Sequence, residues 1–225
     1  MKAPRSLADL SFASGLQSHN DDELELEGDY DRVRFDAVTF ADAEAGGSRF
    51  VESVFTGVAF DGGRMRRARM SDVWFGESRL VAFDLAESSL TDVWLSGCVF
   101  AGVQAFSLVT RRVTFRDCKL DSVNFRDCKL TDVLFEDCVL RDVDFGGAKL
   151  TRVRFPGCTL SGADFTKVSC ADVDLRGARL GDGRAGDGGI RAGYDSLRGA
   201  SIDNLQLMTL APLLAHQLGI TVEDA

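Results

Sequence analysis

Between about residues 30 and 180, large apolar residues recur at every fifth position of the chain. From Tyr30 to Leu180 these 31 positions hold 13 Phe, 11 Leu, two Met, two Ala and one each of Tyr, Cys and Thr. The residue two places before each of them is Val, Ala, Ser, Cys or Gly in 28 of 30 cases. A period of five fits neither an α-helix, with 3.6 residues per turn, nor a plain β-strand, with two. The pattern therefore predicts a protein of stacked repeats.

The polar positions indicate how these repeats are arranged. The three remaining residues of each five are mostly Asp, Arg, Lys, Ser, Thr and Gly, which we expect to face water. The large apolar residue fills a core, and the small one lies where backbones pass close together. A single repeat cannot bury its apolar side alone, so consecutive repeats must stack. Burial contributes about 1.5–3 kcal/mol for each Phe or Leu side chain.

The clearest copies of the repeat are RRVTF, RDCKL, DSVNF, RDCKL and TDVLF, at residues 111–135. This pattern resembles the pentapeptide-repeat family, whose motif has a small residue two places before a central Phe or Leu. The resemblance covers about 150 of the 225 residues. It implies an all-β fold, a right-handed quadrilateral parallel β-helix with four pentapeptides per coil and a C-terminal α-helical cap.

The cysteines support this arrangement independently. Cys98, Cys118, Cys138 and Cys158 are 20 residues apart, which places them one coil apart on one side of the helix. At the ~4.8 Å spacing of neighbouring strands, the repeats would form a rod about 36 Å long. A large residue is missing at Ala105 and Thr110, so we expect Leu108 to fill the core there and the rod to kink.

We divide the chain into four parts. Residues 1–29 are an N-terminal tail or cap, residues 30–180 the β-helix, residues 181–202 a Gly-rich loop with a last strand, and residues 203–225 a helical cap. The N-terminal part combines an acidic run with a short apolar pattern, and it is interpreted either as a mobile leader or as a helix over the first coil. The apolar residues of that pattern are Leu7, Leu10, Phe12 and Leu16.

The C-terminal part carries an apolar stripe. Asp203 is placed to cap a helix, which Pro212 would divide into two and Gly219 would end, with Ile220 and Val222 pairing afterwards. Such helices would cover the open end of the core, either alone or together with a contact between two copies that makes a homodimer. The residues of this cap or dimer contact are Leu205, Met208, Leu210, Leu213, Leu214 and Leu218.

Charge and hydropathy limit the classes of function. The formal net charge is −9, but residues 31–180 carry 22 acidic and 21 basic residues, so the repeat is a nearly neutral mosaic without a basic surface for nucleic acid. No apolar stretch reaches the ~20 residues needed to cross a bilayer. The N-terminus lacks the apolar core of a signal peptide, so we expect a cytoplasmic protein.

The chain offers little for catalysis or metal binding. His19 and His216 have no Ser or Cys partner in a strained turn, as a catalytic triad requires. The six cysteines lack metal-binding spacing, and five occupy the small inward position, where we expect free thiols in the core. The sequence therefore predicts no enzyme, no cofactor and no metal.

Outward columns of residues 20 apart predict the surface. One column contains Val54, Trp74 and Trp94, which places two tryptophans on one exposed face. Exposed aromatic patches mark contacts with partners, although Trp also shields strand edges without any partner. Two rows of carboxylates either imitate DNA phosphates or are ordinary solvated turns. These rows contain Asp72 and Asp92, and Asp84, Asp144 and Asp164.

The resemblance also carries an expectation about function. The best-known role in the family is to bind DNA gyrase or topoisomerase IV as a DNA-shaped decoy, which protects against quinolones and other topoisomerase poisons. In the quinolone-resistance members, a C-terminal extension joins two rods end to end. The nearly neutral repeat argues against imitation of DNA, which needs a dense negative field. The alternative is a structural adaptor that binds another protein through the Trp face.

Overall fold

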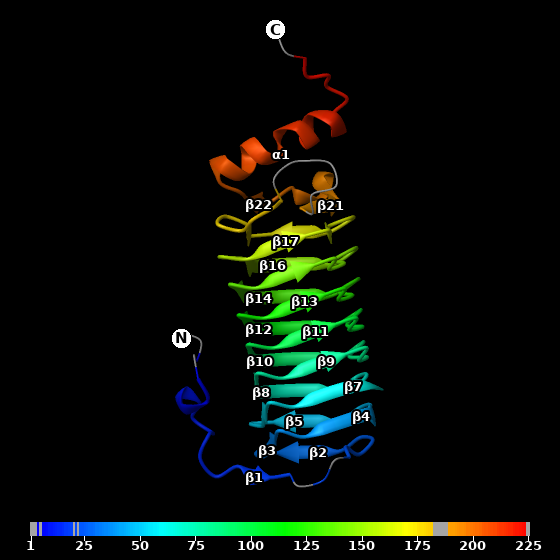
Figure 1. The fold of residues 1–225 in the computed structure, drawn as a ribbon, viewed down its shortest axis with the longest axis vertical. Coiled ribbons are helices and arrows are strands. Elements are labelled where there is room, and N and C mark those ends of the chain that lie inside the picture. Colours follow the sequence, from blue (N-terminus) through cyan, green and yellow to red (C-terminus); the bar gives the residue numbers. More distant parts are fainter. Residues whose placement is uncertain (1–3, 5, 20, 22, 182–188, 224–225) are drawn as a thin grey trace.

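The chain forms a right-handed parallel β-helix, a straight rod of stacked coils (Figure 1). The computed structural model describes residues 4, 6–19, 21, 23–181 and 189–223. The N-terminal segment runs along one side of the rod, and a single α-helix lies across the far end. The fold expected from the five-residue period, including the C-terminal helix, is confirmed.

Two long sheets and one short sheet make up the sides of the rod. The 13-stranded sheet contains β1 (Gln17–Ser18), β2 (Asp29–Asp31), β3 (Val33–Asp36), β5 (Arg49–Val51), β6 (Val54–Thr56), β8 (Arg69–Gly76), β10 (Ser89–Ser96), β12 (Val109–Arg116), β14 (Lys129–Glu136), β16 (Lys149–Arg154), β19 (Ser169–Ala171), β20 (Val173–Asp174) and β22 (Ala200–Ser201). The seven-stranded sheet contains β4 (Thr39–Glu44), β7 (Ala59–Arg64), β9 (Arg79–Val81), β11 (Val99–Ala101), β13 (Lys119–Asp121), β15 (Val139–Arg141) and β17 (Thr159–Ser161). The third sheet pairs β18 (Ala163–Asp164) with β21 (Ile190–Ala192). The helices are the 3₁₀ turns η1 (Leu7–Asp9) and η2 (Tyr194–Leu197), and α1 (Asn204–Gln217).

The register of the coils is 20 residues and continues through the irregular centre of the repeat. Thr110 pairs with Leu90 on one side and with Leu130 on the other. Leu108 is buried and fills the core from a position that is usually small, as expected. The expected kink at Ala105 and Thr110 is wrong, because the hydrogen bonds between coils come from the backbone and do not require a large inward side chain.

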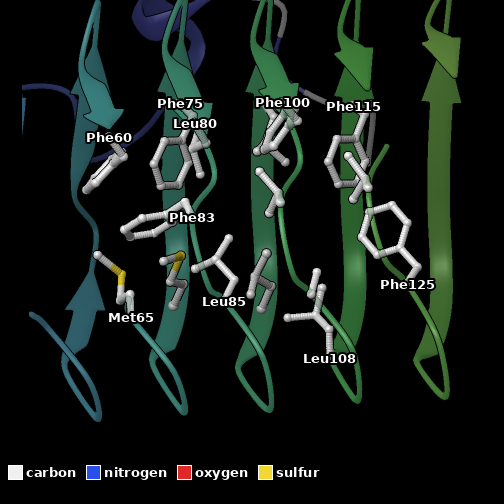
Figure 2. A pocket seen from close by; sticks show the side chains of 16 residues that line it. Phe60, Met65, Phe75, Leu80, Phe83, Leu85, Phe100, Leu108, Phe115 and Phe125 are labelled. Carbon is white, nitrogen blue, oxygen red and sulfur yellow. The ribbon is translucent and has the colours of Figure 1, made fainter. Parts of the chain in front are cut away.

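The core is a continuous apolar ladder of stacked rings and aliphatic side chains. Phe35, Phe55 and Phe75 stack with ring centroids 4.4 Å apart, which is close to the spacing of neighbouring strands. Where Ala105 interrupts the ladder, a cavity of about 30 Å³ remains, lined only by apolar side chains. Figure 2 shows Leu108 and Phe125 beside this space. The substitution of a large residue by Ala105 is therefore compensated only in part.

The small inward position has a role beyond close packing. Ser88 Oγ donates a hydrogen bond to Met65 O at 3.0 Å, and Cys118 Sγ lies 3.5 Å from Leu95 O as a weak donor. In both cases the acceptor lies 23 residues earlier, in the coil below. The column of Cys98, Cys118, Cys138 and Cys158 is in register, and all four are buried and free. The expected core role of these thiols is confirmed.

At the C-terminal end, α1 closes the apolar core. Asp203 caps the helix through a hydrogen bond from Gln206 N to its Oδ1 at 2.9 Å, as expected. Gln206 is buried and donates through Nε2 to the carbonyls of Leu175 and Ala178 in the last coil, at 2.5 and 2.7 Å. Leu210 belongs to the core and is 1% exposed. The helix therefore supplies hydrogen-bond donors and an apolar plug to the end of the rod.

Three expectations for the C-terminal part are wrong. Pro212 does not divide the helix: α1 is continuous, because a proline removes only one helical hydrogen bond and the cap and the packing of the helix compensate. The apolar stripe is not one buried face, since Leu210, Leu213 and Leu214 pack on the core while Leu205, Met208 and Leu218 are exposed. Residues 219–223 contain no strand, and Ile220 and Val222 are exposed.

The Gly-rich region is also more ordered than a plain loop. Residues 182–188 lie outside the described part of the chain, but β21 and η2 follow them. The last strand expected in residues 197–202 is present as β22, which pairs with β20. The hydroxyl of Tyr194 donates to Ile190 O, which holds η2 against the end of β21.

Candidate functional site

The predicted aromatic column exists on an outer face of the 13-stranded sheet. The strand register places Val54 beside Trp74 and Trp74 beside Trp94. The column then continues through Thr114 to Leu134. We call these five residues the aromatic column. Gly76 makes room for it, because a Cβ there would lie 2.8 Å from Trp74 Nε1.

The expectation that this column is an exposed patch is wrong for its lower half. Leu10 and Phe12 cover Val54 and Trp74, and these four residues form a buried cluster separate from the main core. Trp74 is 5% exposed, whereas Trp94 is only partly buried. The N-terminal segment is therefore neither the expected solvated leader nor a helix over the first coil. We call residues 6–18 the N-terminal strap.

The strap is attached at its two ends. At the base of the rod, β1 pairs with β3, with Gln17 N donating to Arg32 O at 2.8 Å. At the other end, the Arg116 guanidinium donates to Pro4 O at 3.0 Å, and the same guanidinium pairs with Glu136. The segment therefore runs from the first coil up to the level of β12, as Figure 1 shows for the N-terminal end.

Between these attachments the strap is held mainly by side chains. Its described backbone hydrogen bonds run within the segment, from Leu10 N to Leu7 O and from Ala13 N to Leu10 O. Burial of Leu10 and Phe12 contributes about 1.5–3 kcal/mol each, whereas ordering a residue costs about 1–2 kcal/mol of backbone entropy. The strap thus adds little net stability and belongs to the regions that open most easily.

Above the strap, the same face remains open. A shallow groove of about 390 Å³ surrounds Leu134 and Arg154. Two carboxylate–guanidinium groups form its sides: Arg152 pairs with Asp132 at 2.5 Å, and Asp174 pairs with Arg176 at 2.7 Å. The face is therefore apolar and covered below, and polar and open above.

The first row of carboxylates lies at the corners of the coils. Asp92 is neutralised by Arg112, whose Nε and Nη2 donate to its two oxygens at 2.6 and 2.5 Å. Asp72 lies near Glu52 and Asp92 with no ion pair in the described residues. Burial, followed by the charges of Asp92 and Glu52, raises the pKa of Asp72 above its usual value. The local negative charge is thus concentrated at one position rather than spread along the rod.

The second row consists of turn-forming side chains. Asp84, Asp144 and Asp164 each accept a hydrogen bond from the backbone N–H two residues later, at 2.7–2.9 Å. Such bonds are typical of Asx turns. Arg126 pairs with Asp144 and Arg191 with Asp164. Burial opposes ionisation of Asp164, but the hydrogen bonds from Thr166 and Arg191 outweigh it and lower the pKa. This row is therefore explained by local structure.

The sequence analysis missed a backbone feature that also accounts for many acidic residues. All 31 positions from Glu27 to Gly177 in steps of five have left-handed backbone, with φ between 44° and 78°. Asp or Gly occupies 18 of them. Gly adopts this conformation freely, and Asp adopts it more readily than most residues. The enrichment of Asp and Gly two places after each large residue was the available signal.

The described residues show no metal-binding group of three or more His, Cys, Asp or Glu side chains. The thiols are poorly suited to act as nucleophiles. Burial raises the pKa of Cys128 to about 12; a hydrogen bond with Cys118 lowers the pKa of Cys98, but that thiol is fully buried. In the described part of the chain, no helix is both long and apolar enough to cross a membrane.

The geometry defines the class first: a β-solenoid whose repeats fill the interior and leave only outer faces for contacts. The family models agree with it. A pentapeptide repeat region matches residues 88–165, and pentapeptide repeats match residues 34–72 and 153–182. The chain belongs to the pentapeptide-repeat family.

Several solved structures resemble the chain at low similarity. A trypsin-treated variant of QnrB1, a plasmid-mediated fluoroquinolone resistance protein, is 22% identical, with 92% of this chain and 95% of that chain covered and a TM-score of 0.42. HetL, involved in heterocyst differentiation regulation in the cyanobacterium Nostoc sp. strain PCC 7120, is 15% identical over 84% and 91% of the two chains, with a TM-score of 0.30. No curated protein sequence matches the chain.

Proposed function

We propose that this protein is a non-catalytic scaffold that binds a partner protein through the aromatic column. The observation that carries the proposal is that this face holds an apolar peptide segment, the strap, against both tryptophans of the chain. Aromatic side chains of this kind are typical of protein contacts. The rod supplies a rigid support, because each coil is fixed by hydrogen bonds to the coils on both sides.

Site-specific cross-linking tests this proposal. A photo-reactive amino acid replaces Trp94 in one variant and Lys119, an exposed residue of the seven-stranded sheet, in a matched control. We expect the same cellular protein to cross-link reproducibly at position 94 and not at position 119. Identical products from both positions, or none from position 94, would contradict the scaffold function.

A second candidate is the decoy for DNA gyrase or topoisomerase IV that the family resemblance implies. The straight rod favours it, as do Asp117 and Asp137, which stack at one corner without an ion pair in the described residues. The two predicted carboxylate rows weigh against it, because arginines or turn hydrogen bonds engage most of their members. A supercoiling assay with purified gyrase, with and without ciprofloxacin, decides the matter. Unchanged supercoiling and unchanged drug-stabilised cleavage at micromolar protein would exclude this candidate.

The homodimer expected from the sequence would use a different set of residues from the predicted stripe. Leu210 is buried in the core, so it is not available to a second copy. Leu205, Met208 and Leu218 are each about three-quarters exposed and would form the contact. Light scattering on the Met208→Asp/Leu218→Asp variant should then give the mass of a monomer and the wild-type chain that of a dimer. Equal masses would refute the dimer.

A further inference from the structure

We propose that the N-terminal strap is a displaceable internal ligand, and that the aromatic column beneath it is a binding groove for an extended apolar peptide of a partner protein. The inference rests on the proposed scaffold function and specifies the partner and the regulation of the same face. The strap shows the recognition chemistry. It presents two apolar side chains two residues apart, Leu10 and Phe12, and a backbone carbonyl, Pro4 O, to the face.

The face is shaped to hold such a segment. Thr56, Gly76 and Ser96 follow the column residues in successive coils and are small, and Gly76 leaves room for the Trp74 indole. Arg116 is the first large residue in that row, and its side chain is 15% exposed. It donates to Pro4 O while Glu136 fixes its orientation. Small residues therefore form the floor of the groove, and a fixed guanidinium binds the main chain at its upper end.

The strap can leave without opening the interior. Its cluster is separate from the core, and the inward side chains behind Trp74, such as Val73 and Phe75, belong to the core cluster. Displacement therefore uncovers only outward side chains of the column. The strap resembles other segments of low local stability that open while the rest of a protein remains folded.

A partner peptide needs an advantage over the strap, because the strap is tethered and has a high effective concentration. The open groove beside Leu134 and Arg154 provides that advantage. It begins one coil above Arg116, where the strap ends, and lies on the same face. A peptide that runs in the direction of the strap and extends beyond it at its N-terminal end gains contacts that the strap does not make. Displacement requires such a difference in affinity between the two occupants.

A fluorescently labelled peptide with the sequence of residues 4–18 is the probe. Its binding is measured by anisotropy to three full-length proteins: wild type, Leu10→Ser/Phe12→Ser, and this double variant with Trp74→Ser added. We expect the double variant to bind at least tenfold more tightly than wild type, because its own strap no longer fills the groove. Addition of Trp74→Ser should remove this gain. Circular dichroism and cooperative unfolding confirm that all three proteins remain folded.

Two results would overturn the inference. One is equal affinity of wild type and the double variant; the other is tight binding that survives Trp74→Ser. The peptide assay is independent of the cross-linking test of the scaffold. If the peptide fails to bind while a protein still cross-links at position 94, the scaffold function stands and the strap mechanism falls. If the peptide binds and no protein cross-links, the groove stands and the scaffold function falls.

Discussion

The two ends of the chain both cover apolar surface, but they do so in different ways. At the C-terminal end, α1 enters the core: Leu210 belongs to the main cluster, and Gln206 satisfies two carbonyls of the last coil. At the N-terminal end, Leu10 and Phe12 lie on a side face in a cluster of their own. Removal of the helix would expose the interior, whereas removal of the strap would expose only the outer column. Position relative to the core thus separates a fixed part from a removable one.

The largest expected effect concerns the fixed end. Leu210→Ala should lower the free energy of unfolding by about 2–5 kcal/mol, because it leaves a cavity where the helix meets the core. The measurement is equilibrium unfolding in urea. Met208→Ala is the control: this side chain lies on the same helix but is 75% exposed, so its effect should stay within about 0.5 kcal/mol. Equal effects of the two substitutions would show that the helix is not a plug.

The next effect tests the polar half of the same cap. Gln206→Ala should cost about 1–3 kcal/mol, since the carbonyls of Leu175 and Ala178 lose their buried donor. Thr209→Ala, an exposed change one turn further along α1, should cost much less. Hydrogen exchange of residues 173–180 should accelerate in the Gln206 variant only. An unchanged exchange rate would mean that the hydrogen bonds do not hold the last coil.

For the removable end we expect a spectroscopic change with little loss of stability. Leu10→Ser/Phe12→Ser should change the free energy of unfolding by about 1 kcal/mol or less, because the burial of the strap is offset by the entropy of ordering it. Both tryptophans of the chain lie under or beside the strap, so their emission should shift to the red and become easier to quench with acrylamide. A loss of more than about 3 kcal/mol would show that the strap is a fixed part.

The smallest effect concerns the corner next to the strap. The raised pKa of Asp72 means that the folded state binds this proton more tightly than the unfolded state. The group therefore contributes stability below its unfolded pKa, and that contribution is lost as the pH rises through the folded value. Asp72→Asn should raise Tm by about 1–2 °C at pH 7 and by nothing near pH 3.

A matched control for this test is Asp142→Asn. Asp142 has the same left-handed backbone, with φ of 48°, but the residues above and below it are Gly162 and Ser122. Its substitution should leave Tm unchanged at both pH values. A gain at pH 7 that matches that of Asp72→Asn would assign the effect to the turn rather than to the stacked carboxylates.

The repeat could be predicted from the sequence because its contacts are periodic. The ladder of Phe and Leu, the register of Cys98 with Cys118 and the inward turn of Leu108 all follow from counting in fives and twenties. The strap could not be predicted in this way: Phe12 and Trp74 are 62 residues apart, and nothing in the period links them. The apolar pattern of residues 7–16 showed that the segment needs a surface to cover, but not which one.

The surface was harder to interpret than the interior for a related reason. Asp84 and Asp144 looked like a charged row, yet their oxygens accept backbone hydrogen bonds in the turns. Residue type alone does not separate a carboxylate that shapes a turn from one that faces a partner. Similarly, Pro212 was a correct sign of a missing hydrogen bond but not of a helix end, because the packing of Leu210 and its neighbours holds α1 together.

The left-handed corner in every pentapeptide restricts how such a rod changes in length. An insertion of one or two residues would move each following corner onto a side and each following side onto a corner. An insertion of five residues would restore the corners but rotate the remaining faces by a quarter turn relative to the column of Trp74 and Trp94. Only a multiple of 20 residues keeps both, so the rod can be lengthened or shortened in whole coils of about 4.8 Å, and duplication of a coil is the simplest way to build a longer one.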